Sequence, residues 1–219
     1  MTEPGAPKPR RRGCLFYGCL SGVGCLVIIL LAFLIGLHQL KRMVNFYTDT
    51  SPAALPPVQM SSGEIDQLKQ RIENFQDAVR SGRPTPPLAL TSDEINALIQ
   101  TDPDFSRLKG KLYVTIDGNR VKGQVSLSLD DLGLRIFRGR YLNGSGVFAV
   151  TLQNGILVIT PDVLVVKGKP LPGVYMDKFR SQNLAEGVNN NPKASVALKH
   201  LQEIRITDGK LILVPKVEQ

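Results

Sequence analysis

The sequence predicts an α+β protein, in which a single N-terminal transmembrane helix is followed by an antiparallel sheet of about five to seven strands (hairpins and a meander) with packed helices. Three observations favour this class. One uncharged apolar run lies near the N-terminus, two helical segments with capping boxes follow, and from residue 112 apolar residues alternate with polar ones. With 42% hydrophobic residues and only 3 cysteines, the 219-residue chain is neither disordered nor a disulfide-rich scaffold.

A membrane span is predicted over residues 14–40. Residues 14–37 contain no charged side chain, and as a helix the stretch 15–37 covers roughly 34 Å, enough to cross a hydrocarbon core of about 30 Å. A cleaved signal peptide is the competing interpretation, but its apolar region is about 7–15 residues long and a small-residue cleavage site follows closely. Neither feature is present, so we predict a single-pass signal-anchor whose partner is the lipid bilayer.

The charges that flank the span predict its orientation. Four bases lie in the tail 1–13, whereas only Lys41 and Arg42 follow the span closely. Segments rich in Lys and Arg stay on the cytoplasmic side. We therefore predict a cytoplasmic N-terminus and an extracytoplasmic C-terminal domain, with topology set by Lys8, Arg10, Arg11 and Arg12.

The remaining chain divides into a proline-containing linker, 41–60, and an α+β domain, 61–219. The linker contains Ser51-Pro52 and Pro56-Pro57 and few charges, which predicts an extended segment that lifts the domain off the bilayer. All three cysteines lie before residue 26, so the domain contains no disulfide, which is more typical of a bacterial envelope protein than of a small eukaryotic secreted domain.

Capping boxes predict where two helices of the domain begin. In each box a Ser or Thr precedes a Glu by three residues, so that their side chains and backbones satisfy each other. The pairs are Ser61 with Glu64 and Thr91 with Glu94. The first helix is predicted to end at residue 80 and the second near residue 102, and further helical segments are predicted at 171–188 and 194–201.

Alternating apolar residues and turn sequences predict the strands. Asp117-Gly118-Asn119 separates strands 112–116 and 121–129, and Asp208-Gly209 separates strands 204–206 and 211–214. Further strands are predicted at 134–137, 141–152 and 156–167. Pro161 lies inside the last of these, which predicts a bulge or an edge position because proline cannot donate to the ladder.

Two segments resemble a known family. Residues 90–99 (LTSDEINALI) and 201–211 (LQEIRITDGKL), together with the order of elements after a single span, look like the first domain helix and the closing hairpin of small membrane-anchored bacterial envelope proteins of the YpmS type. The resemblance implies an exported, non-catalytic domain related to elongated lipid-binding folds. It supplies no site residues.

The sequence offers little catalytic chemistry. The domain contains one histidine, His200, and no serine or cysteine is paired with a base in a recognisable motif. No phosphate-binding loop, zinc-ligand spacing or dinucleotide fingerprint occurs, and the adjacent Asp130 and Asp131 fit a turn better than a paired-carboxylate site. We therefore predict no enzyme activity, no cofactor and no metal.

Basic residues gather between residues 107 and 140. If they share one surface, they would attract anionic headgroups or an acidic envelope polymer, and the alternative is a solvated strand face. An aromatic and basic reader motif is missing and the domain is predicted outside the cytoplasm, so nucleic acid is not expected as a partner. The candidate patch is Lys109, Lys111, Lys122, Arg135, Arg138 and Arg140.

The leading functional hypothesis is that the exported domain binds a lipid-like, amphiphilic ligand or an envelope protein without catalysis. A curved sheet with helices would enclose an apolar cleft, although ordinary core packing explains the same residues. A structural or assembly subunit is the alternative, a homodimer through the small-residue face of Gly18 and Gly22 in the span. The cleft candidates are Leu112, Val114, Val125, Leu127, Val147, Phe148, Leu157 and Ile159.

Overall fold

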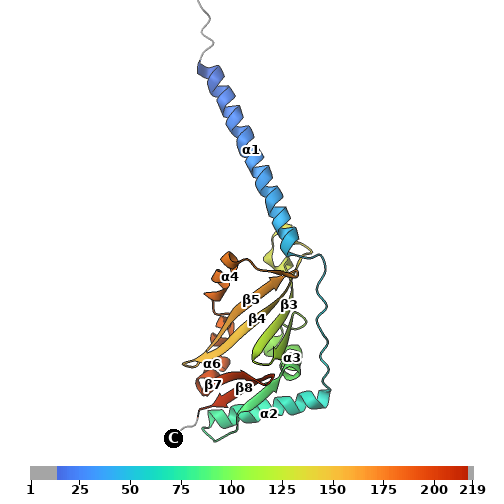
Figure 1. The fold of residues 1–219 in the computed structure, drawn as a ribbon, viewed down its shortest axis with the longest axis vertical. Coiled ribbons are helices and arrows are strands. Elements are labelled where there is room, and N and C mark those ends of the chain that lie inside the picture. The colour runs from blue at the N-terminus through green and yellow to red at the C-terminus, as the bar shows by residue number, and fades with distance from the viewer. Residues whose placement is uncertain (1–13, 217–219) are drawn as a thin grey trace, which may run out of the picture. The chain divides into compact units, whose positions relative to one another are not determined.

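The computed structural model describes residues 14–216, with side chains from Ile28 onward (Figure 1). The chain divides into two compact units, Met1–Phe46 and Tyr47–Gln219. The predicted topology determinants Lys8, Arg10, Arg11 and Arg12 lie outside the described residues.

Helix α1 spans Cys14–Tyr47 and continues past the predicted end of the span at residue 40. Its large apolar side chains from Ile28 onward are exposed, for example 68% for Ile28 and 60% for Phe33. The stretch Ile28–Tyr47 is long and apolar enough to cross a membrane, by length and composition. α1 is therefore a candidate for a membrane anchor or a signal sequence. Gly18 and Gly22 belong to this helix, but their surroundings lie outside the described side chains.

Both capping boxes are confirmed. Helix α2 spans Ser62–Arg80, and the Ser61 backbone N–H donates to Glu64 Oε2 at 2.8 Å while the Glu64 N–H donates to Ser61 Oγ at 3.4 Å. Helix α3 spans Ser92–Thr101 and begins with the same exchange between Thr91 and Glu94. These helix starts are predictable because a capping box is satisfied by residues three apart in sequence.

The first predicted hairpin is confirmed and lies in a five-stranded antiparallel sheet of order β2-β3-β4-β5-β6. Its strands are β2 (Leu112–Asp117), β3 (Arg120–Ser128), β4 (Tyr141–Gln153), β5 (Ile156–Val166) and β6 (Lys169–Pro170). The predicted irregularity at Pro161 is also present. The register of β4 with β5 shifts there, since Phe148 pairs with Pro161 and Val147 pairs with Val163.

The strand predicted at 134–137 is wrong. The connection from β3 to β4 instead contains two 3-10 turns, η2 (Asp130–Leu132) and η3 (Arg135–Phe137). Gly133 and Gly139 have φ values of +67° and +65°, a left-handed conformation that bends the chain before and after η3. The apolar residues of this short segment therefore lie in a folded loop.

The single predicted sheet is corrected to two sheets. A three-stranded sheet of order β1-β8-β7 accompanies the five-stranded one, and its strands are β1 (Leu88–Thr91), β7 (Leu201–Thr207) and β8 (Lys210–Pro215). The final hairpin, β7 with β8, was expected, but β1 was not. β1 has only four residues between Pro87 and a helix, too few for an alternation pattern, and pairs with β8 far along the chain.

The chain between the sheets is helical, as expected, but more broken. α4 (Gly173–Arg180) and α5 (Glu186–Asn189) divide the segment predicted as one helical region, and α6 covers Pro192–Lys199. A further 3-10 turn, η1 (Pro103–Phe105), follows α3.

The hydrophobic core lies around the three-stranded sheet, α2, α3 and α6, at one end of the five-stranded sheet (Figure 1). From the larger sheet, only one end of β4 and β5 packs against this core, through Val150, Leu152 and Leu157. The buried cluster is Leu68, Phe75, Leu88, Leu90, Ala97, Leu198, Leu201 and Ile204. The rest of the five-stranded sheet therefore extends past the core.

The predicted linker is fixed to the domain. Asp49 and Tyr141 exchange two backbone hydrogen bonds of 2.9 Å, and the Ala53 N–H donates to Ser126 Oγ and Asn143 Oδ1, both at 3.0 Å. Farther along, Val58 and Met60 pack against the core. The segment 48–60 has no helix or strand beyond the Asp49 bridge, yet it runs along the domain and does not act as a free spacer.

Candidate functional site

One face of the five-stranded sheet is apolar across four strands. The register aligns Leu112, Val125, Gly144 and Val166 in one row and Val114, Gly123, Gly146 and Leu164 in the next. Cross-strand partners lie on the same side of a sheet, and residues two apart along a strand share that side. The same face therefore also carries Ile116, Val121, Leu127, Leu142, Phe148, Val150, Leu152, Leu157, Ile159 and Pro161.

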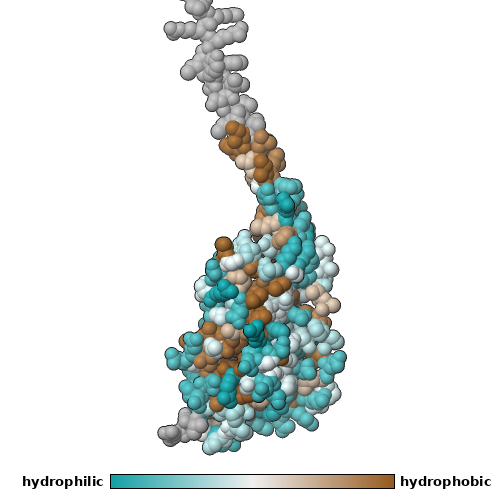
Figure 2. Space-filling model, in the orientation of Figure 1, coloured by the Kyte–Doolittle hydropathy of each residue, from teal (hydrophilic) through white to brown (hydrophobic). Residues whose placement is uncertain are grey.

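Most of these apolar side chains remain partly exposed. Ile116, Gly123, Gly146 and Pro161 are buried, and the others of this set are intermediate. Figure 2 shows apolar surface in the middle of the domain, over the area that β3, β4 and β5 occupy in Figure 1. An antiparallel sheet ordinarily packs its apolar face fully against a second layer. A contiguous apolar face that stays partly accessible is a candidate binding site.

Glycines shape the middle of this face around the Phe148 ring. A Cβ at Gly146 would lie 2.8 Å from Phe148 Cζ and 2.8 Å from Leu164 Cδ2, and a Cβ at Gly123 would lie 3.1 Å from Phe148 Cε2. Contacts below 3.0 Å require a neighbour to move, so the Phe148 ring occupies space beside the backbone that a side chain at Gly146 would fill. The glycines thus lower the surface beneath the ring.

The opposite face of the same sheet is more polar and is already engaged. Ser126 and Asn143 lie on it, the Ser126 hydroxyl donates to Asn143 Oδ1 at 2.8 Å, and both accept from the Ala53 N–H. Asn143 Nδ2 donates to Asp49 Oδ2 at 2.9 Å and to the Ser51 carbonyl at 3.0 Å. The segment 48–53 therefore occupies the polar face, while most side chains of the apolar face stay partly exposed.

Asparagine side chains bind the free backbone of the β2 edge and of the part of β5 that β6 does not cover. Asn96 of α3 donates from Nδ2 to the Val114 carbonyl at 2.6 Å and accepts at Oδ1 from the Val114 N–H at 2.8 Å. On the β5 edge, Asn183 accepts from the Ile159 N–H at 3.0 Å and Asn189 from the Leu157 N–H at 3.0 Å. An unpaired edge is a template for association with another strand. These contacts prevent the β2 edge and this part of β5 from pairing with another strand, so the apolar face of the sheet is the candidate binding surface.

The structure brings seven of the eight predicted cleft residues to one face. Leu112, Val114, Val125, Leu127, Phe148, Leu157 and Ile159 share it, whereas Val147 points to the polar side, opposite Lys122 and Val163. Val147 and Phe148 are sequence neighbours on one strand, so they cannot share a face. Sequence reasoning missed Leu142, Leu164 and Val166, which alternate in the same way, and Gly123, Gly144 and Gly146, which carry no hydrophobicity signal.

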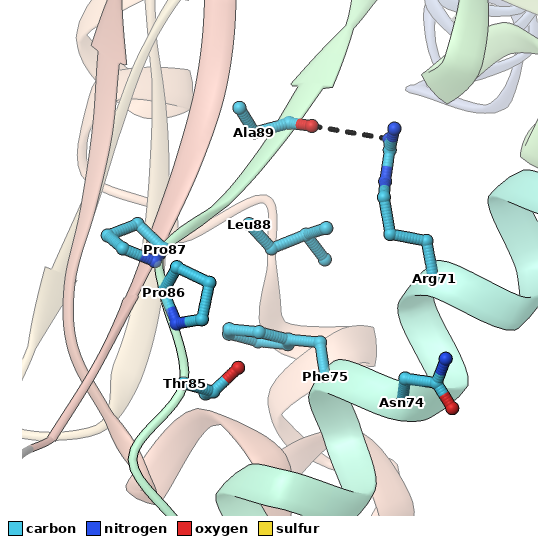
Figure 3. Close-up of a pocket in the computed structure, with 8 residues that line it drawn as sticks. All are labelled: Arg71, Asn74, Phe75, Thr85, Pro86, Pro87, Leu88 and Ala89. Carbon is cyan, nitrogen blue, oxygen red and sulfur yellow. Dashed lines mark hydrogen bonds between the residues drawn. The ribbon is translucent and has the colours of Figure 1, made fainter.

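A second concave site, the α2 groove, lies between α2 and the segment before β1 (Figure 3). It has a volume of 410 Å³, and Figure 3 shows Phe75 extending from α2 toward the prolines on the opposite wall. Its cation is already paired, because Arg71 Nη2 donates to Glu94 Oε1 at 2.6 Å and to the Ala89 carbonyl at 3.3 Å. The groove is lined by Arg71, Asn74, Phe75, Thr85, Pro86, Pro87, Leu88 and Ala89.

Arg71 thus ties α2 to β1 and α3 and does not leave an open charge for a ligand. A smaller pocket of 80 Å³ adjoins the groove at Phe75 and Leu88 and continues toward α6 and the three-stranded sheet. Sequence reasoning treated the prolines of this groove only as a helix stop. Because strand β1 was not predicted, the sequence did not indicate that these prolines lie opposite α2.

The residues of the predicted basic patch lie near both ends of β3. Lys111 continues the β2–β3 ladder, since its carbonyl accepts from the Ser126 N–H at 2.9 Å, and the Arg140 carbonyl accepts from the Leu129 N–H at 2.8 Å, at the same end of the sheet. Lys122 lies near the other end of β3 and is paired with Asp117 at 2.6 Å. Lys109, Lys111, Arg135, Arg138 and Arg140 therefore belong to one end of the sheet, and Lys122 does not.

In the part of the chain that the structure describes, two carboxyl groups have shifted pKa values, and both shifts have local causes. The hydrogen bond from the Ser61 side chain and that from the Ser61 backbone lower the pKa of Glu64. The hydrogen bond and charge of Lys122 lower the pKa of Asp117. Neither group lies on the apolar face. Among the described residues, no group of three or more His, Cys, Asp or Glu side chains is placed to hold a metal ion.

Comparison of the chain with protein-family models, with curated proteins and with solved structures finds no match in any of the three. The resemblance to YpmS-type proteins stays a prediction.

Proposed function

We propose that this protein is a single-pass membrane protein whose extracytoplasmic domain binds an amphiphilic, lipid-like molecule on the apolar face of the five-stranded sheet, without catalysis. α1 would be the anchor, with the basic tail on the cytoplasmic side. The observation that carries the proposal is the face itself, whose apolar side chains on four aligned strands stay partly exposed.

The chemistry of the face favours an acyl chain over a polar ligand. On β2, β3, β4 and β5 its residues are aliphatic or aromatic, apart from glycines and one proline, and these four strands place no charged side chain on it. Lys169 of the short strand β6 pairs with Val166 and therefore lies at the edge of the face. Ligand sites are mostly apolar, with a few polar groups that fix orientation. Here the charged residues lie at the end of the sheet, beside Leu127 and Leu142, so a polar headgroup would project there while the chain covers the strands.

The apolar exposure of α1 supports the anchor. A helix that is apolar on all sides is stable only when it is buried in protein or in lipid. In α1 the side chains of Ile28, Leu31, Phe33 and Ile35 are all more than half exposed. A bilayer would remove this surface from water.

The test uses the domain from Tyr47 onward, which contains the entire buried core cluster. We expect it to enhance the fluorescence of parinaric acid and to carry lipid in native mass spectrometry. In Val125→Gln an amide would lie against the bound chain, which costs about 1–3 kcal/mol and so weakens binding by roughly 5- to 160-fold. In the matched control Val147→Gln, the same substitution lies on the other face of the sheet and leaves binding unchanged.

Thermal unfolding of both variants checks that each is folded. Equal affinity of Val125→Gln and Val147→Gln would contradict the proposed face, and a wild-type domain that binds neither the probe nor lipid would contradict the function.

A further inference from the structure

The loop between β3 and β4, residues 129–140, combines exposed apolar and basic side chains. Leu132 and Leu134 are each 58% exposed, and the exposed Arg135 and Arg138 follow them. Isolated exposed leucines are common on protein surfaces. Two of them beside two arginines on one short loop form the combination that binds a lipid surface, with apolar groups among acyl chains and cations at the phosphates.

The loop is held in a defined shape. Asp130 Oδ1 accepts from the Gly139 N–H at 2.7 Å and its Oδ2 accepts from the Ser128 hydroxyl at 3.0 Å, so this carboxylate closes the loop across its base. The two 3-10 turns then present Leu132 and Leu134 outward. The loop therefore loses little conformational entropy when it binds.

The chain from α1 enters the domain beside this loop. Asp49 forms its paired backbone bonds with Tyr141, the residue directly after the loop. Leu40 is the last apolar residue before Lys41, and the chain that follows it is helical as far as Tyr47. The distance from Leu40 to Asp49 is therefore at most about 20 Å. If α1 crosses a bilayer, the covalent connection alone keeps this end of the sheet near the membrane surface.

Basic residues outnumber acidic ones at this end. The segments that meet there are 47–49, 106–111, 129–140 and 167–169, and together they contain eight bases and three acids. One of the acids, Asp49, is paired with Lys167 at 3.3 Å, and a second, Asp130, closes the loop. The remaining charge is complementary to an anionic leaflet.

We infer that the 129–140 loop docks onto the anionic phospholipid surface of the bilayer that holds α1, with Leu132 and Leu134 inserted and Arg135 and Arg138 at the phosphates. This inference rests on the proposed membrane anchor. Docking also brings Leu127 and Leu142, the last apolar pair of the sheet face before the loop, to the leaflet, so that a lipid passes from the bilayer onto the face without crossing water.

The chain contains no tryptophan, so a single introduced tryptophan reports on its own surroundings by fluorescence. Full-length Leu132→Trp is reconstituted in nanodiscs of phosphatidylcholine alone, or of equal parts phosphatidylcholine and phosphatidylglycerol, with and without brominated lipid. We expect blue-shifted emission from the introduced tryptophan that brominated lipid quenches, most strongly in the anionic discs. The matched control is Ile156→Trp, because Ile156 is 52% exposed at the opposite end of β4 and β5, and its emission stays unquenched.

The arginines are tested in the Leu132→Trp background. Each basic residue near an anionic surface contributes roughly fivefold to binding, so Arg135→Gln with Arg138→Gln lowers the equilibrium constant for docking by about 30-fold and removes the difference in quenching between the two disc types. Arg205→Gln with Lys210→Gln removes the same charge from the exposed β7–β8 hairpin and leaves quenching unchanged. A Leu132→Trp chain that is retained by discs but whose tryptophan emission stays unquenched overturns the docking alone, whereas a chain that does not enter discs overturns the anchor and the docking together.

Discussion

Asn96 is the side chain on which the β2 edge of the five-stranded sheet depends. It is 2% exposed and makes three hydrogen bonds, to the Ser92 carbonyl at 2.9 Å and to both backbone groups of Val114 at 2.6 and 2.8 Å. In Asn96→Ala the Val114 N–H and carbonyl lose their partner while α3 still covers them. The substitution therefore removes buried hydrogen bonds that connect α3 to β2.

The expected cost follows from these contacts. Each backbone group left without a partner costs about 1–3 kcal/mol, and alanine returns roughly 0.6 kcal/mol because it favours the helix more than asparagine does. We expect Asn96→Ala to lower the free energy of unfolding by about 3 kcal/mol. Asn96→Asp keeps the acceptor for the Val114 N–H but places a carboxylate against two carbonyls, so it is worse at neutral pH and recovers in acid, where the protonated group donates.

Urea unfolding of the domain from Tyr47 onward, followed by far-ultraviolet circular dichroism, measures this cost. Asn74→Ala is the matched control, because Asn74 is an exposed residue within α2 and the same helix-propensity gain applies without a lost edge contact. We expect the control to raise the free energy of unfolding by roughly 0.6 kcal/mol, the propensity gain alone. A loss below about 1 kcal/mol for Asn96→Ala would refute the role assigned to this side chain.

Two further predictions concern the centre of the sheet face and the start of α2. Gly146→Ala places a methyl group 2.8 Å from Phe148 Cζ and Leu164 Cδ2, so we expect it to lower the free energy of unfolding by about 1–3 kcal/mol and to weaken the binding of parinaric acid. The control Gly63→Ala places its methyl group in open space on α2 and raises the free energy of unfolding by roughly 0.5–1 kcal/mol. Equal effects of the two substitutions in urea unfolding would contradict the packing around Phe148. Ser61→Ala removes a helix cap and costs about 1 kcal/mol at neutral pH. Because Ser61 lowers the pKa of Glu64 below its ordinary value of 4.5, that part of the stability is present above pH 4.5 and is lost as the pH falls through the lowered pKa, so the gap between variant and wild type narrows in acid; a gap that widens would show that Ser61 acts otherwise.

The predictions that hold are those that depend on local chemistry. Capping boxes at Ser61 and Thr91 start their helices because each involves residues only three apart. The turn at Gly118 closes a hairpin between neighbouring strands, and Pro161 marks a bulge. The wrong strand at 134–137 arose where two left-handed glycines bend a short apolar segment, since apolar content alone does not distinguish a strand from a folded loop.

The apolar face was only partly predictable. Alternation along each strand identified Leu112, Val125 and Leu127, and the error at Val147 came from choosing two consecutive residues of one strand. Gly123 and Gly146 could not be identified as site residues, because a missing side chain becomes meaningful only when the Phe148 ring is seen above it.

By itself, the sequence determined the apolar N-terminal helix, the capped helices, the hairpins and a basic region between residues 107 and 140, since all of these follow from residue type and short spacing. Features that depend on pairing between distant residues became visible only in the tertiary structure. Pairing of β1 with β8 made two sheets out of one, the cross-strand register separated Lys122 from the other basic residues, and the bridge from Asp49 to Tyr141 brought the incoming chain beside the 129–140 loop. Each of these joins residues at least 20 positions apart or sets a register between strands, and no local propensity encodes either.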